Sequence, residues 1–230
     1  MAGRQQGTKA TARRPEAQGC AFDLDHYRAL IDAARTGGYR FAFFDHEPQE
    51  GDLLLRHDVD ISLEAALELA RLEQELGVTA TYLVMTESVF YDLDSAAGRA
   101  ALTTLRGLGH RVGLHAVHPR AELDARFDPV IAWHNPDPEY MRAPVDGVVN
   151  VMQDGFFAPE TYRSDSNQRW RHGCPHAELA AGAFPWLQLL IHPAIWVYEG
   201  ATMGETMASF LAANPAVTRE QLRDDRIDVS

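Results

Sequence analysis

Two carboxylates stand one position apart at the end of LLLRHDVD, residues 53–60. The three leucines favour burial, whereas Asp58 and Asp60 require water, a positive charge or a metal ion. In an extended strand, residues two apart point to the same side and lie about 6.6 Å apart along the chain. We therefore expect both carboxylates to face one cavity, with His57 pointing the other way. The structural alternative is that Asp60 caps the following helix and that Asp58 pairs with Arg56.

Histidines stand at the ends of several other apolar segments. His115 ends RVGLH, His134 follows PVIAW, and His192 follows LQLLI. Imidazole groups near two acids suit a divalent metal ion or proton transfer. The alternative for each is a histidine with ordinary hydrogen bonds, although packing explains His192 poorly because an apolar residue is easier to bury there.

A further histidine, His118, lies three residues after His115 in GLHAVHP. Pro119 favours an extended conformation at His118, so the two histidines do not form a pair on one helical face. His118 is therefore either a second histidine ligand of the metal or a solvated loop residue, and the sequence does not decide between them.

The segment RSDSNQRWRHGCPH, residues 163–176, is polar and irregular, and arginines flank Trp170 on both sides. His172, Cys174 and His176 alternate within it, as zinc ligands on one strand face would. Pro175 interrupts such a strand and a fourth ligand is missing, which favours a plain loop.

The elements that position these residues alternate along the chain. Strands are expected at 39–45, 53–60, 79–85, 111–115, 129–133 and 187–191. Helices are expected at 62–77, 95–109, 201–213 and 218–225, and before Gly37, where apolar residues 27, 30, 31 and 34 share one face. Continuous apolar strands that alternate with helices predict a parallel sheet covered by helices. Active sites of such folds lie at the carboxyl ends of the strands, where the acids and histidines recur.

The composition is that of a soluble globular protein. The 230 residues are 46% hydrophobic, carry a net charge of −12 and contain two cysteines. The acidity disfavours binding to nucleic acid or to an anionic membrane surface. We expect a disordered tail over residues 1–19, a single domain over residues 20–230, and a reducing, cytoplasmic location, since no apolar stretch suggests a signal peptide or a membrane helix.

Four segments together resemble the polysaccharide deacetylase family, the NodB-homology or carbohydrate esterase 4 group. In chain order they are RHDVD, GHRVGLHAVHP, RSDSNQRWRHGCP and LQLLIHPAIW, and the likeness runs from about Asp52 to Trp196. The likeness is greatest to a branch with HDVD and LLIHP segments. It implies a distorted (β/α) barrel with fewer than eight strands and with its helices outside.

The resemblance also implies roles for individual residues. They are Asp60 and His115 as metal ligands, Asp58 as the base, Arg163 as its partner, His192 as the general acid, and Trp170, Asp165 and Arg171 as substrate-binding residues. The family's histidines are four apart, whereas His115 and His118 are three apart, which leaves His134 and His118 as alternatives for the third ligand. The stretch from His118 to His134 is short for a full helix and a strand, so we expect the connection between the strands at 111–115 and 129–133 to be shortened (a trimmed crossover).

The implied function is metal-dependent removal of an acyl group, N-acetyl above all, from a sugar or glycan precursor. The expected metal is zinc, with iron, cobalt and nickel also suited to imidazole and carboxylate ligands. Two alternatives are a hydrolase of cyclic amides or imides on the same scaffold and a non-catalytic carbohydrate-binding relative. The oligomeric state is not predicted.

Overall fold

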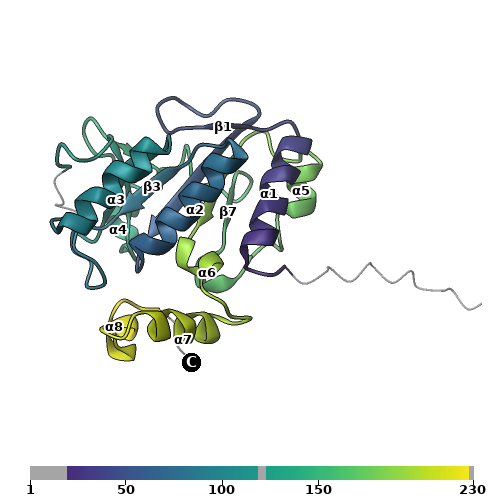
Figure 1. The fold of residues 1–230 in the computed structure, drawn as a ribbon. Coiled ribbons are helices and arrows are strands. Elements are labelled where there is room, and N and C mark those ends of the chain that lie inside the picture. The colour runs from purple at the N-terminus through teal and green to yellow at the C-terminus, as the bar shows by residue number, and fades with distance from the viewer. Residues whose placement is uncertain (1–19, 119–122, 228–230) are drawn as a thin grey trace, which may run out of the picture.

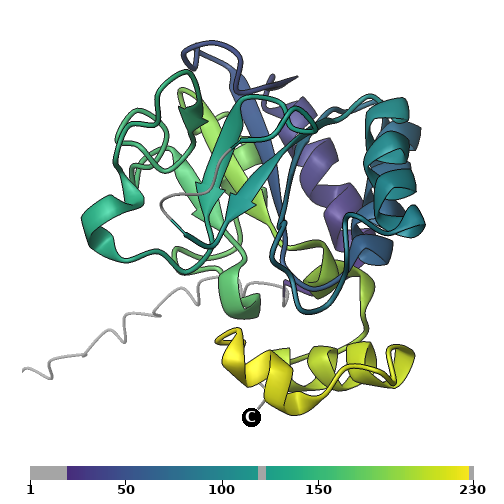
Figure 2. The same ribbon diagram turned by 90° about the vertical axis from the view of Figure 1, so that its left-hand side faces the viewer.

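A parallel β-sheet, curved into a half-barrel, forms the centre of the protein, and helices surround it (Figures 1 and 2). This computed structural model describes residues 20–118 and 123–227, so the tail expected at 1–19 lies outside the described residues. The strands are β1 (Arg40–Ala42), β2 (Asp52–Val59), β3 (Thr81–Val84), β4 (Arg111–Ala116), β5 (Val130–Trp133), β6 (Val149–Asn150), β7 (Tyr162–Ser164) and β8 (Leu187–Ile191).

The sheet order explains why β2 holds the fold together. Its strands follow one another as β6-β5-β4-β3-β2-β8-β7, and β1 pairs with β2 beside this path. Every pairing between these strands is parallel, and β2 is buried along its whole length. A strand buried on both faces needs a nearly continuous apolar run, which Leu53, Leu54 and Leu55 supply. The expected distorted α/β barrel is confirmed.

The helices cover the sheet unevenly. They are α1 (Leu24–Thr36), α2 (Leu63–Leu76), α3 (Ala96–Gly107), α4 (Pro138–Met141), η1 (Ser166–Gln168), α5 (His176–Ala180), α6 (Pro193–Val197), α7 (Met203–Ala213) and α8 (Arg219–Asp224). The long helices α1, α2 and α3 lie along one side of the sheet, and the α7–α8 hairpin lies across the end of the barrel beyond α6 (Figures 1 and 2).

Helix α2 begins and ends at residues that its sequence indicates. Ser62 is the N-cap and accepts a hydrogen bond from the backbone N–H of Ala65, and Gly77 ends the helix with a φ of 64°. The alternative that Asp60 caps this helix is therefore wrong. Its carboxylate is left for the cavity at the end of β2.

Glu73 of α2 lies at the centre of a buried hydrogen-bond network between the helices and the sheet. It accepts hydrogen bonds from the hydroxyl groups of Tyr27 and Tyr82, and His57 Nε2 lies 2.7 Å from its Oε1. Burial alone would raise the pKa of Glu73, but His57, His110 and the tyrosine hydroxyl lower it further than burial raises it. These contacts connect α1, α2, β2 and β3. The histidine among them is His57, which the alternation of side chains along the strand predicted to face away from the cavity.

The sequence predicted the long elements more accurately than the short ones. The strand expected at 39–45 is shorter in the structure, where only β1 forms. The short elements between residues 138 and 197, other than β8, have too few residues to show a helical or strand periodicity of apolar residues, so the sequence did not predict them. Within the described residues, no helix lies between β4 and β5, which agrees with the expected trimmed crossover.

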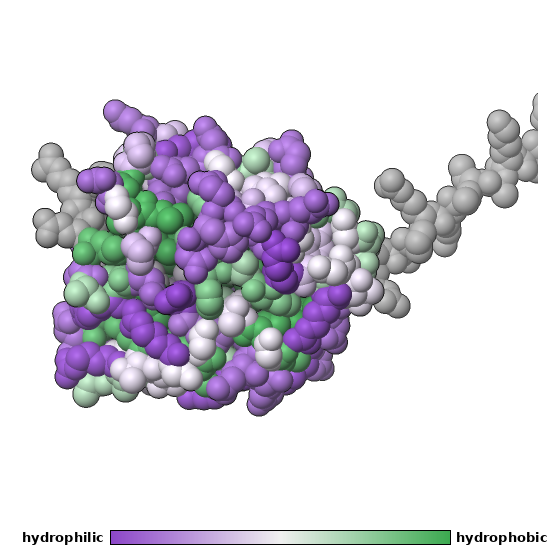
Figure 3. Space-filling model, turned by 90° about the horizontal axis from the view of Figure 1, so that it is seen from above, coloured by the Kyte–Doolittle hydropathy of each residue, from purple (hydrophilic) through white to green (hydrophobic). Residues whose placement is uncertain are grey.

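None of the helices in the described ranges is both long enough and apolar enough to cross a membrane. The end of the molecule near β1, opposite the α7–α8 hairpin, presents polar side chains with smaller apolar areas between them (Figure 3).

The Glu73 network makes a prediction about stability. Replacing Glu73 with Ala leaves two tyrosine hydroxyls and a histidine buried without their partner, so we expect a loss of about 3–5 kcal/mol of unfolding free energy. Chemical denaturation followed by circular dichroism measures this loss. Glu75→Ala on the same helix, where the side chain is 69% exposed, is the matched control and is expected to change stability by less than about 0.5 kcal/mol. Equal effects of the two variants would contradict the importance of the network.

Candidate active site and metal centre

The carboxyl ends of four strands place their acidic and imidazole side chains around one cavity. Asp60 follows β2, His115 lies near the end of β4, His134 follows β5, and His192 follows β8. The cavity has a volume of about 480 Å³, and these four residues line it together with Asp225 from the end of the α7–α8 hairpin. The predicted convergence of the strand ends is therefore observed.

Three donor atoms form a nearly equilateral triangle at the bottom of this cavity. Asp60 Oδ1 lies 3.2 Å from His115 Nε2 and 3.3 Å from His134 Nδ1, and the two imidazole nitrogens are 3.1 Å apart. Ligand bonds of about 2.1 Å at angles between 90° and 109° require donor separations of roughly 3.0–3.4 Å. Asp60 Oδ1 is buried and has no hydrogen-bond partner among the described residues. These residues fit a divalent metal ion.

The third member of the triangle is held by the C-terminal hairpin. His134 Nε2 lies 3.1 Å from Asp225 Oδ1, so the Nδ1 atom of the ring faces Asp60 and His115. Burial would lower the pKa of His134, but contacts with Asp225 and Asp60 outweigh it and raise the pKa to about 10. A carboxylate behind a metal-binding imidazole orients the ring and makes it a better ligand. No pattern in the sequence indicated Asp225, because it follows a short helix of mixed charge, α8, that resembles an ordinary surface helix.

Asp58 lies beside the triangle and is bound by Arg56. The guanidinium donates from Nε to Oδ1 at 2.8 Å and from Nη2 to Oδ2 at 2.6 Å. His115 Nε2 lies 3.7 Å from Asp58 Oδ2. Burial alone would raise the pKa of Asp58, but the charge of Arg56 and that of His115 lower it overall. The pairing with Arg56, considered above as the structural alternative, coexists with a position next to the metal ligands.

The expected partnership of Arg163 with Asp58 is wrong. Arg163 lines the cavity, but its guanidinium donates to the carboxylate of Glu178 and to the backbone oxygens of Pro159 and Tyr162. The carboxylate of Glu178, on α5, binds the guanidinium of Arg163 in place of Asp58. Arg56, two residues before Asp58 on the same face of β2, holds the carboxylate instead.

His192 is oriented from behind by Asp165. The Nδ1 atom of His192 lies 2.5 Å from Asp165 Oδ1, and its backbone N–H donates to Asp165 Oδ2 at 2.9 Å. The indole N–H of Trp196 donates to the same Oδ2 at 2.7 Å. Burial would lower the pKa of His192, but Asp165 and the site acids raise it to about 9. Nε2 of the ring is left facing Asp60, with 3.8 Å between Nε2 and Oδ2.

Asp165 was predicted to bind substrate, and the structure corrects this. The side chain is fully buried and lies behind His192, so it cannot touch a molecule in the cavity. The other two predicted substrate-binding residues, Trp170 and Arg171, do line the cavity. Since β7 ends at Ser164, Asp165 also follows a strand end, but its carboxylate contacts His192 and Trp196 and is not part of the cavity lining.

His118 does not join the donor triangle. Its side chain is 67% exposed, and its Nε2 lies 3.5 Å from the carboxylate of Glu87. Of the two alternatives for the third ligand, the geometry favours His134. The pairing of β5 with β4 holds His134 beside the end of β4, where its backbone N–H donates to the carbonyl of Ala116 at 2.8 Å.

Comparison with known proteins adds one likeness. No protein-family description matches the sequence, and no curated protein matches it. Among solved structures, a family 4 carbohydrate esterase from Bacillus anthracis is similar, at 16% sequence identity, with 96% of each chain covered and a TM-score of 0.30. Neither that identity nor that TM-score carries an assignment of function.

The competing positions of His134 and His118 make a prediction about metal binding. His134→Ala is expected to lose one equivalent of bound divalent metal per chain, because it removes one corner of the triangle. His118→Ala is expected to keep that equivalent. Elemental analysis of both variants after gel filtration, alongside the unchanged protein, measures the difference. Loss of metal in His118→Ala, or full retention in His134→Ala, would contradict the assignment.

Proposed function

We propose that the protein is a metal-dependent hydrolase that removes an acyl group, N-acetyl above all, from a sugar or glycan precursor. Asp60, His115 and His134 would hold the metal, for which zinc suits the two imidazoles and one carboxylate. The observation that carries the proposal is the donor triangle, with Asp58 next to His115 and His192 next to Asp60, all in one cavity. Hydrolysis of an amide requires a base for the attacking water and an acid for the leaving amine, and these two side chains supply both.

Asp58 is suited to the role of base. When bound, the metal ion would lower the pKa of a water molecule and polarise the acyl carbonyl. Asp58 lies outside the triangle, and Arg56 keeps it ionised. It can therefore accept the proton that leaves the attacking water. A buried carboxylate without Arg56 would take up a proton and lose this ability.

His192 is suited to the role of acid. Asp165 fixes the ring and stabilises its protonated form, so Nε2 carries a proton at neutral pH. That proton points into the cavity on the side of Asp60. His192 can deliver it to the leaving nitrogen as the C–N bond breaks, and the charge on Asp165 compensates the imidazolium before transfer. Trp196, which donates to Asp165, holds this carboxylate in place.

The cavity indicates a compact substrate. At about 480 Å³ it has the size of a small-molecule site, and residues of the α7–α8 hairpin, among them Met203 and Met207, form one of its walls. Trp170 and Arg171 form another part of the lining and offer an aromatic face and hydrogen-bond donors, which suit a sugar ring and its hydroxyl groups. A cytoplasmic location is part of the proposal, and both cysteines are free thiols.

The proposed chemistry predicts that Asp58 and His192 are each needed for turnover. Asp58→Asn and His192→Gln are expected to reduce acetate release from N-acetylglucosamine or its derivatives by about 10²–10⁴-fold, while bound metal is retained. Enzyme-coupled detection of acetate and elemental analysis of the same samples measure both quantities. Asp146→Asn and His118→Gln, changes at exposed positions, are the matched controls.

Three outcomes would contradict the proposed function. Unchanged acetate release in Asp58→Asn would exclude it as the base. Ring opening of a cyclic amide or imide, without acetate release from any N-acetyl sugar, would favour the other hydrolase. Sugar binding with no product at all would favour a non-catalytic carbohydrate-binding protein.

Arg171 is expected to act on substrate binding alone. It is exposed, lines the cavity and has no ion-pair partner among the described residues, so its guanidinium is available to substrate. Arg171→Ala is expected to raise KM by about 10–100-fold with little change in kcat, as for loss of a charged hydrogen bond made equally in ground and transition states. Arg169→Ala, two residues away and outside the cavity, is the control. A fall in kcat with constant KM would contradict this role.

A further inference from the structure

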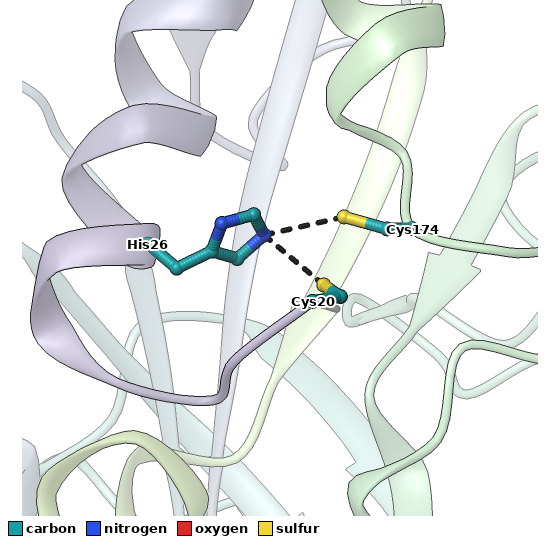
Figure 4. Close-up of side chains that lie close together, drawn as sticks. All are labelled: Cys20, His26 and Cys174. Carbon is teal, nitrogen blue, oxygen red and sulfur yellow. Dashed lines mark hydrogen bonds between the residues drawn. The ribbon is translucent and has the colours of Figure 1, made fainter. Parts of the chain in front are cut away.

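A second group of metal-binding side chains lies outside the cavity. His26 Nε2 is 3.0 Å from Cys20 Sγ and 3.2 Å from Cys174 Sγ, and all three donor atoms lie within 4.8 Å of one another (Figure 4). His26 and Cys174 are 148 residues apart in the sequence, so tertiary packing brings them together. Cys174 was considered above with His172 and His176, but its partners in the structure are Cys20 and His26.

The fold sets the positions of these three residues. Cys20 precedes α1, and His26 lies in the first turn of that helix, where its backbone N–H donates to the capping carboxylate of Asp23 at 2.7 Å. Cys174 lies in the loop just before α5. Helices α1 and α5 pack so closely that a Cβ atom on Gly37 would lie 1.9 Å from the carbonyl oxygen of Leu179. The close packing of the two helices places Cys174 next to the imidazole.

We propose that Cys20, His26 and Cys174 form a zinc site, separate from the centre at Asp60, with a fourth position open to solvent. Two thiolates and an imidazole are soft and borderline donors that zinc prefers in proteins. Each of the three residues is partly exposed, so an ion and a water molecule can reach them. Zinc bonds of about 2.3 Å to sulfur and 2.05 Å to nitrogen require about 3.6 Å between Sγ and Nε2. Binding therefore opens the triangle by roughly half an ångström.

The position of His26 favours a metal site over a simple disulfide. A disulfide requires only the two sulfurs, whereas here one imidazole nitrogen points between both of them (Figure 4). The indole N–H of Trp170 also donates to Cys20 Sγ at 3.1 Å. A donor aimed at a sulfur ligand from outside the ligand set is typical of metal–thiolate centres, where it stabilises the charge on sulfur.

The site would connect the beginning of α1 to the wall of the cavity. Trp170 and Arg171, which line the cavity, lie in the same loop as Cys174. The ring of His26 stacks on Trp196, with 6.2 Å between centroids and 5° between planes, and Trp196 donates to Asp165 behind His192. Zinc at this position would therefore stabilise the loop that shapes the cavity, and its presence does not depend on the proposed reaction.

Cobalt substitution distinguishes the two metal centres. Asp60→Ala protein, purified under reducing conditions and loaded with Co²⁺, is expected to bind one equivalent and to show the near-ultraviolet thiolate-to-cobalt charge-transfer band, because the cysteine site is intact. Asp60→Ala combined with Cys174→Ser is expected to lose both the band and the equivalent. His176→Ala, whose ring stacks on His26 at 5.7 Å without belonging to the donor group, is the control and is expected to keep the band.

A milder variant keeps the test decisive if Cys174→Ser fails to fold. Trp170→Phe removes only the N–H donor to Cys20 and is expected to weaken zinc binding by about 10–100-fold, measured by competition with a chromophoric chelator. Absence of the charge-transfer band in Asp60→Ala protein would overturn the zinc site. A Cys20–Cys174 disulfide found by mass spectrometry in protein purified without reductant, together with no zinc in the reduced protein, would overturn it as well. Loss of hydrolase activity alone would bear only on the centre at Asp60.

Discussion

Strand β2 carries buried ionisable side chains on both of its faces, and this single constraint organises the structure. On the cavity face Arg56 neutralises Asp58 through two hydrogen bonds, and on the helix face His57 contacts Glu73. A buried polar group left without its partner in either position would cost free energy of unfolding, about 1–3 kcal/mol or more, which favours the register and rotation of β2 in which both contacts form. Asp60 directly follows the carboxyl end of β2. Because β2 is fixed in this way, the side chain of Asp60 lies in the cavity.

The side chains of the candidate site come from different strands, and different elements of the fold hold them in place. Each candidate ligand comes from a different strand end, and two of the three imidazoles near Asp60 are oriented by carboxylates from distant elements. Asp225 of the C-terminal hairpin orients His134, and Asp165 orients His192. The two supporting acids act at a distance from any substrate, yet they determine which ring nitrogen faces the cavity and whether it carries a proton. The position of a residue at a strand end brings its side chain to the cavity. The packing of elements distant in sequence then sets the orientation of that side chain.

Strand-end placement could be predicted because it follows from periodicity and from the rule that parallel strands share one edge. The same logic identified Asp60, His115, His134 and His192 without any knowledge of their neighbours. It could not decide between His118 and His134, since spacing along the chain does not tell how the loop after β4 returns. It also misjudged Arg163 and Asp165, because a guanidinium or carboxylate on a short strand takes whichever partner packing offers. Asp225 and the contact of Cys20 with Cys174 depend entirely on contacts distant in sequence.

The bend of the sheet has a consequence for the metal centre. Neighbouring strands lie about 4.8 Å apart, so a flat sheet would hold the ends of β2 and β5, three positions apart, roughly 14 Å from each other. Asp60 Oδ1 and His134 Nδ1 are nevertheless 3.3 Å apart. The curvature of the sheet is thus what brings the three donor atoms close enough to share one ion. Gly113 of β4, where a Cβ atom would lie 2.5 Å from the carbonyl oxygen of Val130, permits the tight approach of β5. A methyl group at that position would push the two strands apart and separate the ligands without altering any of them.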